Sequence, residues 1–185
     1  MSFLINYSAV KRTFDISLSC IGLFLSVPLW ILFSFAIWLE GGRPIFYIQV
    51  RIGKDNRLFE AIKFRTMGYK KKYSRLARLL RTTALDELPQ LISIIKGEMS
   101  FVGPRPLIPQ EIQMTKGFNL RSTVPPGLTG LAQVLASKDA PILEKFNYDI
   151  SYIKNQNIGL DILLILKSFK ISLTRKWDVI NNGLK

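Results

Sequence analysis

The chain has 185 residues, and 26 Lys and Arg against 13 Asp and Glu give it a net charge of +13 at neutral pH. This excess favours polyanionic partners, namely nucleic acid, anionic lipid headgroups or phosphate-bearing substrates. The chain has no histidine, which excludes histidine bases and histidine metal sites, and its single cysteine, Cys20, excludes an internal disulfide. An enzyme of this composition must work with carboxylates, Lys and Arg, to which an oxygen-ligated cation can be added.

The first long element is a stretch without charge from Ile16 to Leu39, whose 24 residues are enough to span a bilayer as a helix. Ser26 and Pro28 lie in its middle and predict a sharp bend, because proline removes a backbone donor and clashes with the preceding turn. Each half is then too short to cross alone. A kinked spanning helix and a re-entrant hairpin both fit the pattern, as does the buried core helix of a soluble basic domain.

The charges on both sides of this stretch favour the hairpin. Residues 43–81 contain twelve basic and two acidic residues, which places them on the cytoplasmic side by the positive-inside rule. Lys11 and Arg12 precede the stretch and also resist translocation. We therefore expect a re-entrant membrane hairpin over residues 1–42 and one compact domain over residues 43–185 at the cytoplasmic face.

The rest of the chain predicts a small, helix-rich α+β domain. Aromatic and β-branched runs predict a β-hairpin, and leucines at helical spacing predict helices that include interfacial amphipathic ones. The expected elements in chain order are strands at 44–50 and 58–64 joined by a turn at 53–56, a basic helix at 69–81, a short apolar helix at 88–96 ended by Gly97, and an amphipathic helix at 158–173. The basic helix can equally present a solvated face, and the last helix can lie on the membrane or close the core.

Two adjacent carboxylates, Asp86 and Glu87, stand at the start of the predicted apolar helix. Neighbouring side chains point in different directions, so one can act as a nucleophile while the other holds a cation. A helix N-terminus offers unpaired amides and favours phosphate nearby. Simple capping of the helix explains the same two residues.

Besides the two carboxylates, two groups of cations are candidates for a functional site. Arg105 stands between two prolines, which support its guanidinium rigidly, and Arg binds phosphate oxygens as a two-donor fork. Lys63 and Arg65 alternate along the second predicted strand and are expected on one face. A rigid surface turn and a solvated strand face are the competing explanations. Together with the carboxylates, these cations suit phosphoryl transfer, in which charge stabilisation dominates.

A series of motifs in this order resembles that of the bacterial sugar transferases known as monotopic phosphoglycosyl transferases, over nearly the whole chain. The motifs are Lys11–Asp15 before the Pro-bent apolar stretch, Gly42–Gly53, Lys63–Met67, Leu85–Gln90, Lys96–Pro106, Pro126–Gln133 and Tyr148–Asp149. The sequence departs from many relatives at Ala84, where they have Ser, and between Met67 and Leu79, which is shorter. Neither departure removes a group that the resemblance assigns to catalysis.

The resemblance implies a two-step reaction at the bacterial inner (cytoplasmic) membrane, as the initiating step of glycan synthesis. Asp86 would attack the β-phosphate of a UDP-sugar and release UMP, and undecaprenyl phosphate would then take the sugar phosphate from the carboxylate. Glu87 would coordinate Mg²⁺, a hard cation that prefers oxygen ligands. Arg105 would bind phosphate, with weaker assignments to the same site for Lys63, Arg81 and Asp149.

Two other functional classes account for less of the sequence. A basic membrane protein without enzymatic activity, which binds anionic phospholipid or recruits a partner, explains the apolar stretch and the charge. It leaves Asp86, Glu87 and the arginine between prolines without a role. A nucleic-acid-binding protein explains the charge alone and has no use for 24 apolar residues, so no nucleic acid partner is expected.

Overall fold

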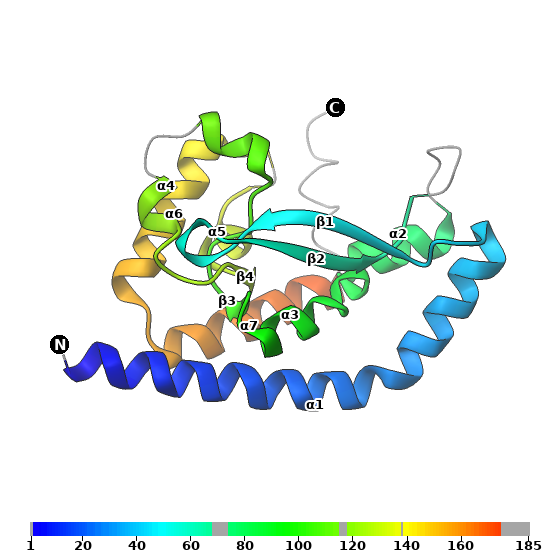
Figure 1. The fold of residues 1–185 in the computed structure, drawn as a ribbon, viewed down its shortest axis with the longest axis horizontal. Helices are drawn as coiled ribbons and strands as arrows, with labels where there is room; N and C mark the ends of the chain where they lie inside the picture. Colours follow the sequence, from blue (N-terminus) through cyan, green and yellow to red (C-terminus); the bar gives the residue numbers. More distant parts are fainter. Residues whose placement is uncertain (1, 68–73, 115–117, 138, 175–185) are drawn as a thin grey trace.

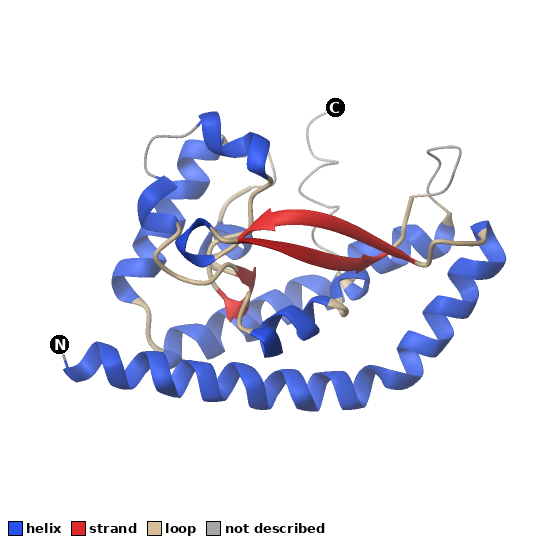
Figure 2. Cartoon of the chain, viewed as in Figure 1, coloured by secondary structure: helices blue, strands red, loops and turns tan. Residues whose placement is uncertain are grey.

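The computed structural model describes residues 2–67, 74–114, 118–137 and 139–174 as a mixture of helices and small sheets (Figures 1 and 2). In chain order the elements are α1 (Ser2–Gly41), β1 (Phe46–Ile52), η1 (Lys54–Asn56), β2 (Leu58–Phe64), α2 (Arg75–Thr82), η2 (Leu85–Glu87), α3 (Gln90–Lys96), β3 (Ser100–Val102), η3 (Pro109–Met114), α4 (Phe118–Arg121), β4 (Gly127–Thr129), α5 (Leu131–Leu135), α6 (Ile142–Asn155) and α7 (Ile158–Thr174), where η marks a 3-10 helix. The expected α+β class is confirmed.

Helix α1 is a single element of 40 residues with Pro28 inside it. It runs along one side of the molecule and bends towards the β1–β2 hairpin (Figure 1). The hydroxyl of Ser26 donates to the Leu23 carbonyl and accepts from the Trp30 indole, both at 3.1 Å, so polar groups beside the proline are paired. The predicted bend is confirmed. Because the two halves remain one continuous helix, the re-entrant hairpin is not shown and stays a prediction.

The N-terminal half of α1 is fixed to the rest of the chain by polar contacts. Lys11 Nζ lies 2.7 Å from a carboxylate oxygen of Asp161 in α7, which also accepts from the Tyr7 hydroxyl at 3.0 Å. Arg12 donates to two carbonyls at the C-terminal end of α3, where a cation is favoured. Asp15 accepts from the backbone of β3 at 3.2 Å. These contacts hold α1 against α3, β3 and α7 together.

The C-terminal half of α1 is held by apolar packing. Phe33 and Ile37 are buried in one cluster with Phe64 of β2 and Leu80 of α2. The Phe33 and Phe64 rings meet edge to face with centroids 5.8 Å apart, a favoured aromatic geometry. Both ends of α1 therefore contact the same folded body, so the predicted division at residue 42 stays a prediction.

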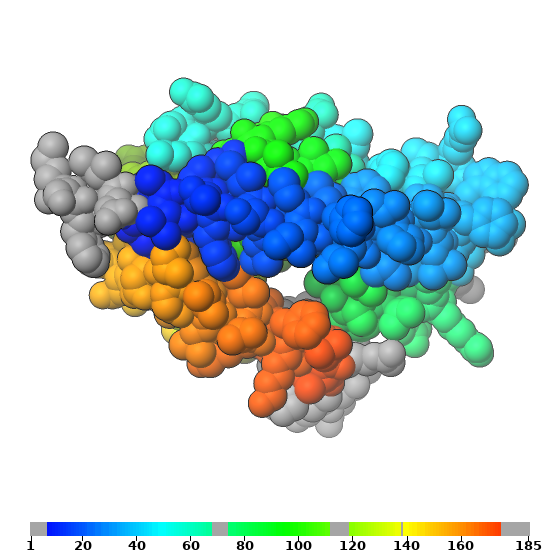
Figure 3. Space-filling model, turned by 90° about the horizontal axis from the view of Figure 1, so that it is seen from below, coloured from blue at the N-terminus to red at the C-terminus, as the bar shows by residue number. Residues whose placement is uncertain are grey.

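Helices α1 and α7 lie on one face of the molecule (Figure 3), and both expose apolar side chains. Phe24 is 79% exposed, and further exposed apolar side chains include Ile21, Leu25, Ile31, Leu32 and Phe35 of α1 and Leu166, Phe169 and Leu173 of α7. Large exposed apolar areas are typical of surfaces that contact membrane or protein. In the described part of the chain, one helix, Tyr7–Gly41 within α1, is long and apolar enough to cross a membrane, consistent with membrane association.

Two pairs of strands shape the rest of the fold. β1 and β2 are antiparallel, and β2 has the predicted bounds. β3 and β4 form a short parallel pair that the sequence did not predict. Gly127 must be glycine, because a Cβ there would lie 2.1 Å from the backbone nitrogen of Gly103. This close approach fixes the start of the irregular segment that carries Arg105.

The predicted helices are found with shifted bounds. The apolar helix is α3, which ends at Gly97 with φ of 85°, and the amphipathic helix is α7, which buries Asp161 and Leu164 while exposing its outer apolar face. The basic helix is present only as α2, and residues 69–73 of the prediction lie outside the described residues. Helix α6 was not predicted.

We predict that Lys11→Met destabilises the protein by about 3 kcal/mol, because it leaves the Asp161 carboxylate buried without its cation. Thermal unfolding in detergent, followed by tryptophan fluorescence, should shift down by roughly 6–12 °C. Lys96→Met, which removes an exposed lysine, is the control. The double variant Lys11→Met/Asp161→Asn should recover part of the loss. Equal midpoints for Lys11→Met and the control would contradict the prediction.

Candidate active site

Asp86 and Glu87 lie in η2, a 3-10 turn between α2 and α3. Ala84 precedes the turn in the left-handed region with φ of 57°, a conformation that costs a residue with a Cβ about 1–2 kcal/mol. This residue redirects the chain so that the two carboxylates point inward instead of extending α2. They were expected at the start of α3, but that helix begins later, at Gln90, with no side-chain cap from its N-cap residue Pro89.

The Asp86 carboxylate is buried, with 9% of the residue exposed. Burial, and then the negative charge of Glu87, raises the pKa of Asp86 to about 6, against the opposing effect of Lys63 and Arg81. The structure therefore brings four of the predicted site residues into electrostatic contact. A carboxylate in this setting is more basic than usual, yet ionised above pH 6.

Glu87 and Lys63 form an ion pair in the wall of a small pocket. Lys63 Nζ forms a hydrogen-bonded ion pair with Glu87 Oε1, and each side chain is about one-fifth exposed. The pocket is lined by Arg51 and by Ala61 and Lys63 of β2, Glu87, Gln90 of α3, Arg105, Pro106, Gly127 and Leu128. Lys63, Glu87 and Arg105 thus line the same pocket, and their role as a substrate site stays a prediction. Asp86 adjoins this group through Glu87 and does not itself line the pocket.

Arg51 is a site residue that was not proposed from the sequence. It lies in β1, where the register pairs it with Phe59 and pairs Tyr47 with Lys63, so it shares a face with Lys63. Its guanidinium donates to the Pro106 carbonyl at 2.9 Å, and burial and the charge of Arg105 lower the pKa of Arg51. The strand expected at 44–50 ended before Arg51, and only the observed register of β1 with β2 places Arg51 beside Lys63.

Asp149 does not line this pocket and is instead paired with Arg121. Its carboxylate accepts from Arg121 Nε at 2.8 Å, and both side chains are almost fully buried. Arg121 also donates to the carbonyl of Arg105 at 2.9 Å and lies 4.1 Å from the centroid of the Phe146 ring. The pair therefore supports the backbone that presents Arg105. A direct contact of Asp149 with phosphate stays a prediction.

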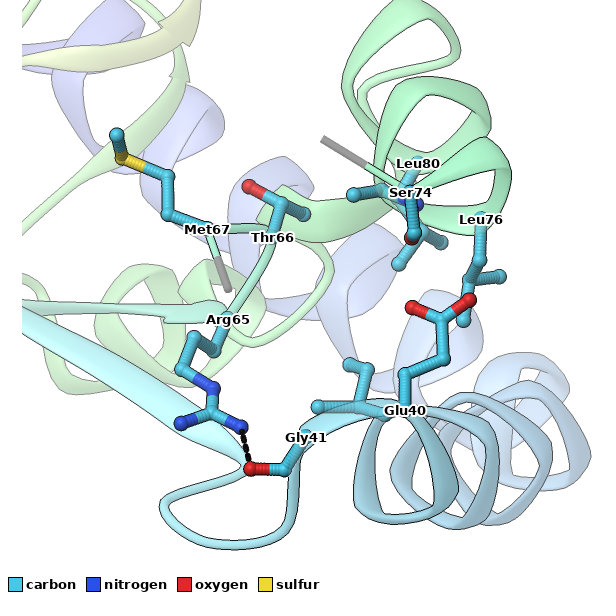
Figure 4. Close-up of a pocket in the computed structure, with 10 residues that line it drawn as sticks. Glu40, Gly41, Arg65, Thr66, Met67, Ser74, Leu76 and Leu80 are labelled. Atoms are coloured by element: carbon cyan, nitrogen blue, oxygen red, sulfur yellow. Dashed lines mark hydrogen bonds between the residues drawn. The ribbon is translucent and has the colours of Figure 1, made fainter. Parts of the chain in front are cut away.

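Arg65 belongs to a different place in the molecule. The sequence predicts that Arg65 shares a face with Lys63. β2 ends at Phe64, but the backbone nitrogen of Arg65 still donates to the Ile45 carbonyl at 2.8 Å, so the shared face stays a prediction. Arg65 donates to the carbonyls of Gly41 and Gly42 at 2.9 Å each, where a cation complements the C-terminal end of the helix. It lines a cleft of about 230 Å³ between α1 and α2 (Figure 4).

The arrangement can bind anions and support transfer of a charged group without histidine. Three cations, Arg51, Lys63 and Arg105, surround a pocket whose carboxylate, Glu87, adjoins the buried Asp86. Among the described residues, no group of three or more carboxylate or thiol side chains converges on one point, so these residues form no complete metal site by themselves. The chemistry that fits is transfer of a charged group such as a phosphoryl group.

Comparison with known proteins agrees with this chemistry. A profile of the family described as bacterial sugar transferase matches residues 6–175. The UDP-galactose-lipid carrier transferase of Erwinia amylovora is 34% identical over 90% of this chain, and the undecaprenyl-phosphate galactose phosphotransferase of Salmonella typhimurium is 32% identical over 90%. The exopolysaccharide production protein ExoY of Rhizobium meliloti is 32% identical over 85%.

The length of the match differs among these relatives. The chain spans 41% of the Erwinia and Salmonella proteins and 83% of ExoY. The matched region nevertheless contains every site element described above, from the N-terminal part of α1 to the end of α7. The chain belongs to the bacterial sugar transferase family.

Proposed function

We propose that this protein transfers a sugar 1-phosphate from a UDP-sugar to undecaprenyl phosphate and releases UMP, as the initiating step of bacterial glycan synthesis. The observation that carries the proposal is the buried carboxylate of Asp86 beside Glu87 and a pocket lined by three cations. The names of the relatives support it, since two of them describe transfer of a sugar to a lipid carrier or to undecaprenyl phosphate. The identity of the sugar is open in this proposal.

Asp86 is the proposed nucleophile. One of its carboxylate oxygens attacks the β-phosphorus of the UDP-sugar, and the bond from that phosphorus to the bridging oxygen breaks, so that its electron pair leaves with UMP. An oxygen of undecaprenyl phosphate then attacks the same phosphorus and returns the carboxylate to Asp86. Its raised pKa makes the ionised carboxylate a better nucleophile than an exposed aspartate, and its burial keeps bulk water from the intermediate.

The cations supply binding and charge stabilisation. Arg105, exposed at the pocket edge and held at its backbone by Arg121, is placed to grip phosphate oxygens as a fork. Lys63 and Arg51 add positive charge on the hairpin side of the same pocket, and Arg81 lies close enough to oppose the raised pKa of Asp86. Such fixed charges stabilise the negative charge that spreads over a transferring phosphoryl group.

The residues present fit a magnesium ion. Glu87 and Asp86 are two carboxylates whose mutual repulsion contributes to the raised pKa of Asp86, and a cation between phosphate and Glu87 would relieve it. Mg²⁺ is commonly held by one or two carboxylates, with substrate phosphates and water as its other ligands. Glu87 would hold it, and when bound the ion would offset phosphate charge. Lys63 would keep the Glu87 carboxylate in position.

The same geometry supports a re-entrant α1 at the cytoplasmic face of the inner membrane. Polar contacts fix one end of α1 and apolar packing fixes the other to the same body, while the bent middle exposes its apolar side chains. A spanning helix would carry one end across about 30 Å of hydrocarbon and break one set of contacts. This placement lets a lipid phosphate and a soluble nucleotide meet at Asp86, and the net charge of +13 favours binding to anionic phospholipid.

We predict that Asp86→Asn lowers UMP release from a UDP-sugar by more than about a thousandfold, because the amide cannot form the acyl phosphate. The measurement is UMP release in detergent with Mg²⁺ and undecaprenyl phosphate, with radiolabelled donor used to trap the sugar phosphate on the protein. Asp139→Asn, which removes an exposed carboxylate, should keep both UMP release and labelling of the protein. Undiminished release by Asp86→Asn would remove the nucleophile assignment.

The same substitution should stabilise the fold at neutral pH. The folded pKa of Asp86, about 6, lies above its ordinary value of 3.8, so its ionisation opposes folding. Wild-type stability linked to this group is fully present below pH 3.8 and is lost as pH rises through 6. In EDTA, Asp86→Asn should therefore gain up to about 3 kcal/mol over wild type at pH 7.5 and almost nothing at pH 4. Denaturant unfolding at both pH values measures this; a gain independent of pH would contradict it.

Cysteine labelling tests the membrane arrangement. In a Cys20→Ala background we predict that Ser8→Cys and Glu40→Cys, exposed near opposite ends of α1, react with an impermeant maleimide only in inverted membrane vesicles. Permeabilised cells provide the positive control for both positions. Labelling of either cysteine from outside intact cells would show a spanning helix instead.

A further inference from the structure

An additional polar residue lines the pocket that Lys63 and Glu87 share. Gln90, the first residue of α3, is only 2% exposed and is among the residues that line this pocket. Its side-chain nitrogen Nε2 is buried and has no hydrogen-bond partner within the described structure. Buried donors are almost always paired, and one that is left without a partner destabilises the fold, so an orphan donor at a pocket wall calls for an explanation.

The surroundings of Gln90 define what could pair with it. The pocket is lined by the cations Arg51, Lys63 and Arg105 and by one carboxylate, Glu87, which is already bound to Lys63. An amide nitrogen only donates, so its partner must be an acceptor. A pocket with three cations and one carboxylate selects an anionic acceptor, and a phosphate oxygen is the anionic acceptor that also suits the two arginines.

The position of Gln90 in the chain strengthens this assignment. It follows Glu87 by three residues, the spacing that places side chains as neighbours along a helical turn. A fourth cation buried there would be repelled by the other three, whereas an uncharged amide can be buried and still donate. Its place in α3, packed against α1, limits its movement.

We propose that Gln90 is a substrate-contacting residue whose amide Nε2 donates to a non-bridging phosphate oxygen in this pocket. The inference rests on the proposed transferase function and adds a neutral donor to its cations. Arg51, Lys63 and Arg105 then surround the phosphate with positive charge, and Gln90 fixes the direction of one oxygen. Preorganised neutral donors of this kind act where negative charge develops during phosphoryl transfer.

Gln90→Met tests the proposal, because it keeps the length of the side chain and removes the donor. We expect the kcat/KM for UMP release to fall at least tenfold, while the unfolding temperature without substrate stays the same or rises. Gln90→Glu replaces the donor by a negative acceptor and should lose more activity. Ser19→Ala is the matched control: it removes another fully buried polar atom without a partner, in α1, and should leave the rate unchanged.

Two further measurements identify which substrate's phosphate Gln90 contacts and distinguish a failure of this inference from a failure of the proposed function. Loss of single-turnover UMP release without lipid would place the contact on the nucleotide sugar, and loss only with undecaprenyl phosphate present would place it on the lipid phosphate. Pyrophosphate should raise the unfolding temperature of wild type more than that of Gln90→Met, a readout that needs no catalysis.

Some outcomes would overturn the inference. Wild-type kcat/KM in Gln90→Met would do so, as would a loss of activity accompanied by a lower unfolding temperature, because the amide would then be a packing group. A wild-type protein that is stabilised by pyrophosphate but releases no UMP from any UDP-sugar would instead contradict the proposed function and leave the Gln90 contact standing.

Discussion

The burial of the Asp86 carboxylate beside a second carboxylate is the constraint around which this fold is arranged. A buried charge costs free energy unless opposite charges lie close, and here Lys63 and Arg81 compensate only in part, which leaves the pKa of Asp86 raised to about 6. The left-handed Ala84 adds backbone strain at the same turn. Such local costs are typical of functional sites, where reactivity is maintained by the stability of the surrounding structure.

That surrounding structure consists of buried ion pairs that position backbone segments. Arg121 and Asp149 hold the carbonyl of Arg105 from behind. On the other side, Lys11 and Asp161 join α1 to α7, and the Asp161 carboxylate accepts from the Tyr152 hydroxyl, which also lies 3.2 Å from the Val102 carbonyl in β3. Helix α1 and the segment that leads to Arg105 are thus linked through one continuous set of polar contacts.

In the proposed membrane placement, the bent α1 connects the membrane to the candidate site. Its apolar middle exposes side chains such as Phe24, while its two ends contact the elements that precede and follow the Asp86 turn. If the exposed face lies in lipid, the depth of the active site is fixed by the helix and not by a flexible linker. This arrangement suits a reaction between a substrate dissolved in the membrane and one dissolved in water, because neither must leave its own phase.

The sequence alone determined the local features of the protein, and tertiary structure decided the rest. Strand-forming residues after the turn at 53–56 predicted the bounds of β2, Pro28 predicted the bend in α1, and Gly97 predicted the end of α3, because each depends on neighbouring residues. The ordered motifs also predicted Asp86 and Glu87 as site residues. The pairing of Arg121 with Asp149, the placement of Arg51 and Gln90 in the pocket, and the hydrogen bonds of Arg65 to the end of α1 depend on strand register and on contacts between distant segments. Local patterns cannot specify such contacts, since the packing of all elements together decides which side chains meet.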